Sequence, residues 1–217
     1  PDVVCLVDNC YGEFVATSEP TAVGADLIAG SLIKNPGGTI VPCGGYVAGR
    51  PEWVEAAACR LTAPGIGSHG GATLEHNRLL YQGLFLAPQM VGEALKGGLL
   101  VAEVFSRLGY AVNPMPGWPR HDVIQAIQLG SPARLIQVCR VLQQHSPVGS
   151  YLDPVPGEQP GYDSELMMAG GTFIDGSTSE LSADGPLRPP YTLFCQGGTH
   201  WTHWAIALEA LLPTLHA

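Results

Sequence analysis

VDNCYGEF at residues 7–14 and VGADLIAGSLIKNPGG at residues 23–38 are the two segments that decide the fold. In the first, a run that is apolar from Val3 onward ends at Asp8. The second is a mostly apolar run that ends at Lys34, one of only two lysines in the chain. Continuous apolar runs are typical of buried parallel strands, and open α/β sheets place ligand groups at the carboxyl ends of such strands. We therefore expect Asp8 and Lys34 at the same edge of one sheet.

The composition predicts a globular protein and argues against several partners. The chain has 217 residues, of which 46% are hydrophobic and 13% charged, and its net charge is −9. Scattered arginines form no basic stripe, so we expect no nucleic-acid partner. No apolar run approaches the roughly 20 residues that span a bilayer, and no secretory leader pattern is present. We expect no membrane contact and a cytoplasmic location.

The cysteines and histidines do not predict a metal site. Six cysteines are far apart and show no CxxC or Cys/His spacing, so reduced thiols are the better interpretation. His200 and His203 are three residues apart in GGTHWTHW, but no third ligand stands at a suggestive spacing. We expect packing at the start of a helix there, and no metal.

The remaining pattern alternates strands and helices and predicts an α/β fold. Pro51 or Glu52 suits a helix start, and Pro88 should divide the long helical stretch into two helices. The expected strands cover residues 3–7, 26–33, 39–48, 166–174 and 191–195, and the expected helices 51–63, 72–87, 89–109, 122–129, 131–145 and 201–215. Residues 146–164 should be irregular, and a loop at 113–119 should separate two domains, 1–112 and 113–217.

Lys34 and Asp8 together have the chemistry of a pyridoxal phosphate (PLP) site. Burial disfavours the charged form of a lysine, and a neutral amine can form a Schiff base with an aldehyde. PLP also needs an acid beside its ring nitrogen, because a protonated ring withdraws electrons from the substrate. The alternatives are a lysine that reaches solvent and an Asx turn at Asp8.

The two opening segments, together with GGYVAGR at residues 44–50, resemble the PLP enzymes of fold type I that handle cysteine, cystathionine and methionine. Within that group the chain is most similar to the methionine gamma-lyase-like family, also labelled aluminium resistance proteins. The likeness extends over nearly the whole chain, including residues 171–198. It implies the second part of the large mixed-sheet, PLP-binding domain, with long helices leading out, followed by a smaller α+β C-terminal domain.

The resemblance also implies roles for single residues. Lys34 would form the internal aldimine and act as the catalytic base, and Asp8 would pair with the pyridinium. Ser31 would donate its hydroxyl to the cofactor phosphate. Better-studied relatives carry a second hydroxyl residue directly before the lysine, where this chain has Ile33. Evidence for phosphate binding by this segment is therefore weaker than evidence for the Schiff base.

Further binding residues are assigned by region. Arg188 is the first choice for the substrate α-carboxylate, because a guanidinium grips a carboxylate at two points, and Arg50 is the competing candidate. An ion pair of Arg188 with Asp184 or Glu180 is the structural alternative. Asn9 and Tyr11 border the acid and would orient it or the ring hydroxyl of PLP. Ser177, Thr178 and Ser179 resemble a polar cap before a helix or turn more than a nucleophile.

Fold type I enzymes take a glycine-rich phosphate loop and a stacking aromatic from the half that precedes the acid-bearing strand. Neither is in this sequence, and we expect an upstream half that this chain lacks. Relatives build sites across subunit boundaries, which implies a homo-oligomer, a dimer or a tetramer.

The expected function is that of a PLP-dependent carbon-sulfur lyase acting on a sulfur amino acid such as methionine or cystathionine. Elimination would release a thiol, a 2-oxo acid and ammonia. β- and γ-elimination stay open, and transamination shares the first intermediate. The alternative from another class is a non-catalytic truncated piece that serves only in assembly.

Overall fold

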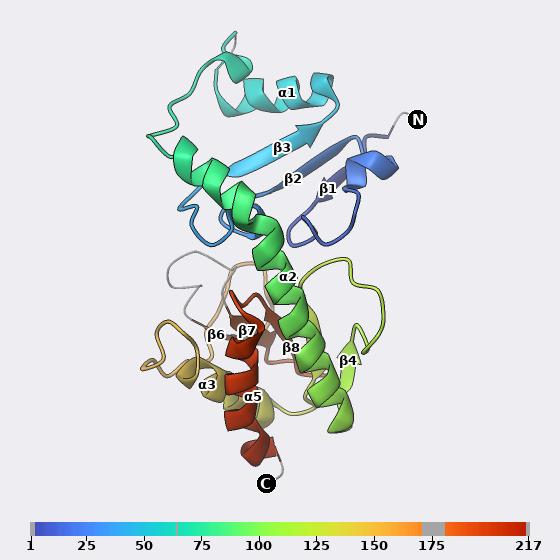
Figure 1. Cartoon of the computed structure of the whole chain (residues 1–217), viewed down its shortest axis with the longest axis vertical. Coiled ribbons are helices and arrows are strands. Elements are labelled where there is room, and N and C mark those ends of the chain that lie inside the picture. The colour runs from blue at the N-terminus through green and yellow to red at the C-terminus, as the bar shows by residue number, and fades with distance from the viewer. Residues whose placement is uncertain (1–2, 64, 171–180, 216–217) are drawn as a thin grey trace.

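The computed structural model describes residues 3–63, 65–170 and 181–215, which form two units joined by one long helix (Figure 1). The first unit has a three-stranded sheet in the order β1-β2-β3. Its strands are β1 (Leu6–Asp8), β2 (Leu27–Ser31) and β3 (Gly45–Gly49). β1 runs parallel to β2, and β3 runs antiparallel to β2. Helix α1 (Pro51–Leu61) follows β3 directly.

The second unit is a five-stranded antiparallel sheet in the order β4-β5-β8-β7-β6. Its strands are β4 (Ala111–Asn113), β5 (Gln125–Gln128), β6 (Leu166–Ala169), β7 (Ser182–Pro186) and β8 (Thr192–Gln196). Helices α3 (Pro132–Gln144) and α5 (Trp201–Leu215) cover one face. The Ser131 hydroxyl caps α3 by accepting a hydrogen bond from the Arg134 backbone N–H.

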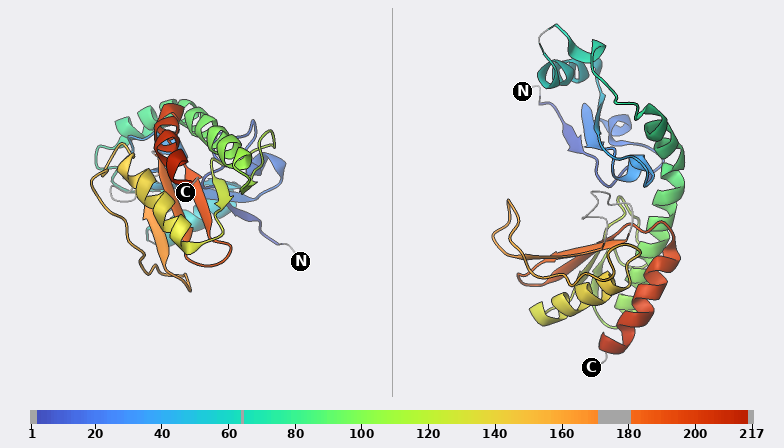
Figure 2. Two further views of the ribbon diagram at one scale, coloured as in Figure 1. Left: turned by 90° about the horizontal axis from the view of Figure 1, so that it is seen from below. Right: turned by 90° about the vertical axis from the view of Figure 1, so that its left-hand side faces the viewer.

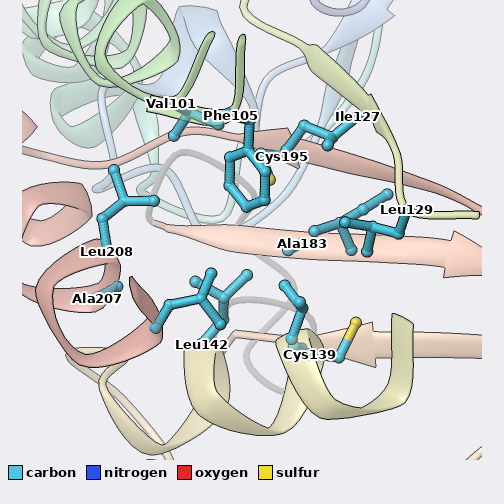
Figure 3. Packing of buried hydrophobic residues seen from close by; sticks show 14 of the residues in the cluster. Val101, Phe105, Ile127, Leu129, Cys139, Leu142, Ala183, Cys195, Ala207 and Leu208 are labelled. Carbon is cyan, nitrogen blue, oxygen red and sulfur yellow. The ribbon is translucent and has the colours of Figure 1, made fainter. Parts of the chain in front are cut away.

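Helix α2 (Asn77–Arg107) runs along both units, which lie on the same side of it and face each other (Figure 2). Its C-terminal half belongs to the core of the second unit, where Val101 and Phe105 pack with the inner face of the sheet and with α5 (Figure 3). Gly97 allows α5 to approach closely, because a Cβ atom there would lie 2.3 Å from Cδ1 of Trp204. The tight crossing of α2 and α5 therefore depends on this glycine.

The structure confirms the α/β class and most of the expected elements. β1 and β2 are adjacent and parallel, and α1, α3 and α5 lie where the sequence predicts them. β6 and β8 also fall inside or next to their expected ranges. The expected strand at 39–48 is only partly present, because β3 begins at Gly45. The expected boundary between the two domains lies between residues 112 and 113. Strand β4 (Ala111–Asn113) crosses this boundary, so the second sheet begins slightly earlier than expected.

Two expectations are wrong. The first is the division of the long helix at Pro88, because α2 continues through this residue. Pro88 is exposed, so the backbone carbonyl that loses its hydrogen-bond donor can bond to water. Packing of α2 before and after Pro88 holds the helix together. The second is the expected helix at 122–129. This segment instead contains strand β5 (Gln125–Gln128), which lies inside the sheet between β4 and β8. Asp122 Oδ1 accepts a hydrogen bond from the Ile124 N–H at 2.8 Å, and this turn replaces a helix start.

Strand β7 was not expected, because its sequence, SADGP, has low strand propensity. Its backbone is held by pairing with β6 on one side and β8 on the other. Residues 171–174 of the expected strand, Ser177, Thr178, Ser179 and Glu180 lie outside the described residues.

α2 is the single described helix that is long and apolar enough to cross a membrane by length and composition alone. The core helix of a soluble protein passes the same test, and α2 packs against β4, β5, β8 and α5 of the second unit and against the short 3-10 helix Asn35–Gly37 of the first.

Candidate active site

Asp8 lies at the carboxyl end of β1, paired in register with Ala29 of β2. It is exposed, and its Oδ1 accepts a hydrogen bond from the Cys10 backbone N–H at 3.1 Å. This is the Asx turn that the sequence left open. A carboxylate can accept several hydrogen bonds, so the turn leaves Asp8 able to bind a further donor.

Lys34 follows the carboxyl end of β2 and is half-buried. Its Nζ lies 4.8 Å from the centroid of the Tyr11 ring, a cation–π distance. Burial raises the pKa of the neighbouring Cys10 thiol, the Lys34 ammonium lowers it, and the Asp8 carboxylate raises it. Asp8 ends β1 and Lys34 closely follows the end of the adjacent parallel strand β2, so the structure brings both to the same edge of the sheet.

The loop that follows Asp8 is fastened to the residue after Lys34. The Asn35 side-chain amide donates to the backbone carbonyls of Tyr11 (3.0 Å) and Glu13 (3.1 Å). Asn35 is 6% exposed, so this contact is shielded from water. The acid-bearing loop and the lysine-bearing loop therefore hold each other in place.

The buried Glu13 and the half-buried Tyr46 form a hydrogen-bonded pair next to Gly30 of β2. The Tyr46 hydroxyl donates to Glu13 Oε1 at 2.9 Å, and Glu13 is only 3% exposed. Burial raises the pKa of Glu13 and also that of the Tyr46 phenol. Gly30 leaves room for the pair, because a Cβ atom there would lie 2.5 Å from Glu13 Oε1. Sequence reasoning missed Glu13, although a lone acid between two apolar strands was an available signal.

Asn9 and Ser31 are engaged in local hydrogen bonds. The Asn9 side-chain amide donates to Glu19 Oε2 (2.8 Å) and to the Tyr46 hydroxyl (3.2 Å), so it fixes the loop. The Ser31 hydroxyl oxygen accepts from the Ile33 N–H at 3.3 Å, in the turn that leads to Lys34. The Ser31 proton can still be donated to an acceptor such as a phosphate oxygen.

The second unit contributes Gln196, the last residue of β8, to this site. Its Nε2 donates to the Tyr11 hydroxyl at 3.2 Å, and the residue is 5% exposed. Tyr11 also packs against a small cluster formed by Val91 and Ala94 of α2 and by Val123. The site therefore lies at the junction of the two units. Sequence reasoning missed Gln196, because nothing in its neighbourhood points to Tyr11.

The structure does not bring either expected arginine to Lys34. Arg50 lies beyond β3, where Gly49 pairs with Leu27 at the opposite end of β2, and it forms ion pairs with Asp26 (2.9 Å) and Glu52. Its competing role as a carboxylate binder has no support from this placement.

Arg188 lies in the turn between β7 and β8, whereas Ser182 and Gln196 pair at the other end of this hairpin. It lines a pocket of about 310 Å³ together with Asp184 and Tyr162. Burial raises the pKa of Asp184 to about 6. Arg188 therefore lies at the end of β8 opposite Gln196, the β8 residue that contacts Tyr11.

The cysteines are free thiols, and His200 lies beside a helix start. All six cysteines are free thiols, as expected. Among the described residues, no group of three or more His, Cys, Asp or Glu side chains could hold a metal ion. His200 is exposed next to the start of α5, and its Nδ1 lies 2.9 Å from the Thr202 hydroxyl.

The chain is similar to longer proteins of one family. It is 46% identical over 214 residues to the Bacillus subtilis (strain 168) uncharacterized protein YnbB, covering 99% of this chain and 51% of that one. A solved structure of a carbon-sulfur lyase involved in aluminum resistance from Clostridium novyi NT is 47% identical, with a TM-score of 0.91, over 99% of this chain and 50% of the other. The chain therefore spans about half the length of both relatives.

A more distant structure shares the fold alone. It is apo CalE6, a methionine gamma lyase from Micromonospora echinospora, with 18% identity, a TM-score of 0.57, and coverage of 96% of this chain and 55% of that one. The family described as Methionine gamma-lyase matches residues 1–216. On this match, the chain belongs to the methionine gamma-lyase family.

Proposed function

We propose that this chain carries the lysine-bearing half of the active site of a PLP-dependent carbon-sulfur lyase of fold type I. The observation that carries the proposal is that Asp8 ends β1 and that Lys34 closely follows the carboxyl end of the adjacent parallel strand β2. Family membership and the printed name of the Clostridium novyi relative support it. The substrate would be a sulfur amino acid such as methionine or cystathionine.

The residues present fit the aldehyde and the ring nitrogen of PLP and contribute one group to its phosphate. Lys34 offers an amine for the aldehyde carbon, and the exposed Asp8 offers a carboxylate for the ring nitrogen. Ser31 offers one hydroxyl for the phosphate. When bound, PLP would act as an electron sink for an amino acid joined to it, so that a thiol can leave.

The chain's own groups would then hold and move protons. The Asp8 carboxylate would keep a proton on the ring nitrogen, and the Lys34 amine would take the proton from the substrate α-carbon. The Tyr11 ring beside Lys34 would keep the amine in the site. We propose elimination over transamination, because the similar solved protein is named as a lyase.

The exposed surface of the first unit supports completion of the site by further protein. β1 is an edge strand, and Leu6 on it is 61% exposed, while Val3 just before it is 77% exposed. A bare apolar edge strand is a template for pairing with another strand. We propose that an upstream segment, of the kind that the longer relatives have room for, covers this edge and supplies the phosphate loop. A homo-oligomer and a cytoplasmic location complete the proposal.

The experiment is titration of the purified protein with PLP, followed by absorbance. A lysine-bound cofactor absorbs near ~420 nm, and Lys34→Ala should abolish the band. Lys96→Ala is the matched control, since Lys96 is the other lysine of this chain and is ion-paired with Glu93 at 2.6 Å. A folded protein without the band, in this chain and in a full-length relative, would favour the non-catalytic alternative. Release of 2-oxo acid from a panel of sulfur amino acids then identifies the substrate.

A further inference from the structure

Gln196 and Lys34 both contact the side chain of Tyr11, Gln196 at the hydroxyl and Lys34 over the ring. The Gln196 amide donates to the Tyr11 hydroxyl at 3.2 Å, across 185 positions of sequence. Lys34 Nζ lies 4.8 Å from the centroid of the Tyr11 ring. The second unit is thus connected to the lysine through one aromatic side chain.

We propose that Gln196 is a positioning residue for Lys34: it holds the Tyr11 ring against the lysine amine and so couples the second unit to the site. The significance of this coupling for catalysis rests on the proposed function, in which Lys34 is the reacting amine. The coupling itself is a property of the described residues and can be tested without the cofactor.

Gln196 is well anchored for this role. Its backbone pairs with Ser182 of β7, and the preceding residue, Cys195, pairs with Gln125 of β5. The carbonyl of the following residue, Gly197, accepts a hydrogen bond from Trp204 Nε1 at 2.8 Å. The strand and the helix therefore fix the point from which the amide reaches Tyr11.

Tyr11 needs a second point of attachment. Its backbone carbonyl is held by the Asn35 amide at 3.0 Å, but the ring can still rotate about its side-chain bonds. Packing against Val91 and Val123 limits this rotation in part. The hydrogen bond from Gln196 fixes the far end of the ring, and its loss would leave a partly buried hydroxyl without this donor.

The two lysines of this chain make the coupling measurable. Reductive methylation with formaldehyde and a borane reductant modifies the neutral amine, and peptide mapping by mass spectrometry separates Lys34 from Lys96. The ratio of their rates cancels differences in reagent and protein concentration. Gln196→Met keeps the length of the side chain and removes the donor, while Gln128→Met is the matched control on the exposed outer end of β5.

We expect Gln196→Met to raise the Lys34 rate about 2- to 5-fold relative to Lys96, which is the range given by loss of a partly exposed cation–π contact. Gln128→Met should leave the ratio unchanged. Tyr11→Phe keeps the ring but removes the hydroxyl that Gln196 binds, so it should reproduce the effect. The variant with both substitutions should show the same labelling ratio as either single variant, because both changes remove the hydrogen bond between Gln196 and Tyr11.

An unchanged ratio in either folded variant overturns the proposal. If Gln196→Met does not fold, Tyr11→Phe alone decides, since its change is confined to one hydroxyl. The PLP titration gives a separate answer. A changed labelling ratio without a PLP band supports Gln196 as a positioning residue and rejects the lyase. A PLP band with an unchanged labelling ratio supports the lyase and rejects Gln196 as a positioning residue.

Discussion

Asp184→Asn should stabilise the protein at neutral pH and have little effect at acidic pH. Asp184 lies on β7 between Met168 and Phe194, on the sheet face opposite the helices. Burial raises the pKa of its carboxyl from 3.8 to about 6. A carboxyl with a raised pKa in the folded state favours folding below its unfolded pKa, and that advantage is lost as pH rises through the folded value.

The size of the change in unfolding free energy follows from the change in the pKa of Asp184. About 2 pKa units correspond to about 3 kcal/mol at 1.36 kcal/mol per unit, and partial access of water makes this an upper value. Wild type should therefore lose up to about 3 kcal/mol of stability, relative to Asp184→Asn, between pH 4 and pH 8. The assay is urea unfolding across this range, with exposed Asp163→Asn as the control.

A difference between wild type and Asp184→Asn that stays constant from pH 4 to pH 8 would refute this reasoning. Arg188 lines the same pocket, but the ion pairs found among the described residues include none between it and Asp184. If an ion pair with Arg188 offsets the burial of Asp184, Arg188→Ala will destabilise the protein at pH 8. The same experiment therefore tests the ion pair that the sequence suggested as an alternative role for Arg188.

Three further substitutions test the packing around α2 and β2. Gly97→Ala should cost about 1–3 kcal/mol in urea unfolding, because its Cβ atom would lie 2.3 Å from Trp204, whereas Gly92→Ala, with no atom within 4 Å, should be neutral or slightly stabilising. Pro88→Ala should raise the thermal midpoint by several degrees, since the helix already continues through this position and regains a hydrogen bond; a lowered midpoint would mean that the proline ring packs favourably. Gly30→Ala should weaken PLP binding by displacing the buried acid and the half-buried phenol next to it, and an unchanged affinity would show that this pair does not support the site.

The sequence predicted the part of the site that depends on strand ends. Asp8 and Lys34 each follow an apolar run, and parallel strands bring such positions to one edge whatever connects them. Helix α1 was also predictable, because Pro51 stands at a helix start.

The rest of the site depends on contacts that leave no local signal. Gln196 reaches Tyr11 only because α2 brings the second sheet beneath the first, and no pattern around either residue encodes that path. Arg188 was matched by region, but the direction of the β7–β8 hairpin decides its place and carries it to the outer end. The segment at 122–129 suits either a helix or a buried strand, and its neighbours in the sheet settle the choice.

The unbroken helix α2 also sets how the two halves of the site are spaced. Each residue of an α-helix advances the chain by about 1.5 Å and turns it by about 100°. Removing one residue between Val91 and Gly97 would therefore swing the whole second sheet around the helix axis and carry Gln196 away from Tyr11, although neither side chain had changed. The length of α2 thus sets the geometry of the candidate site, and point substitutions along its exposed face should be tolerated far better than a single insertion or deletion.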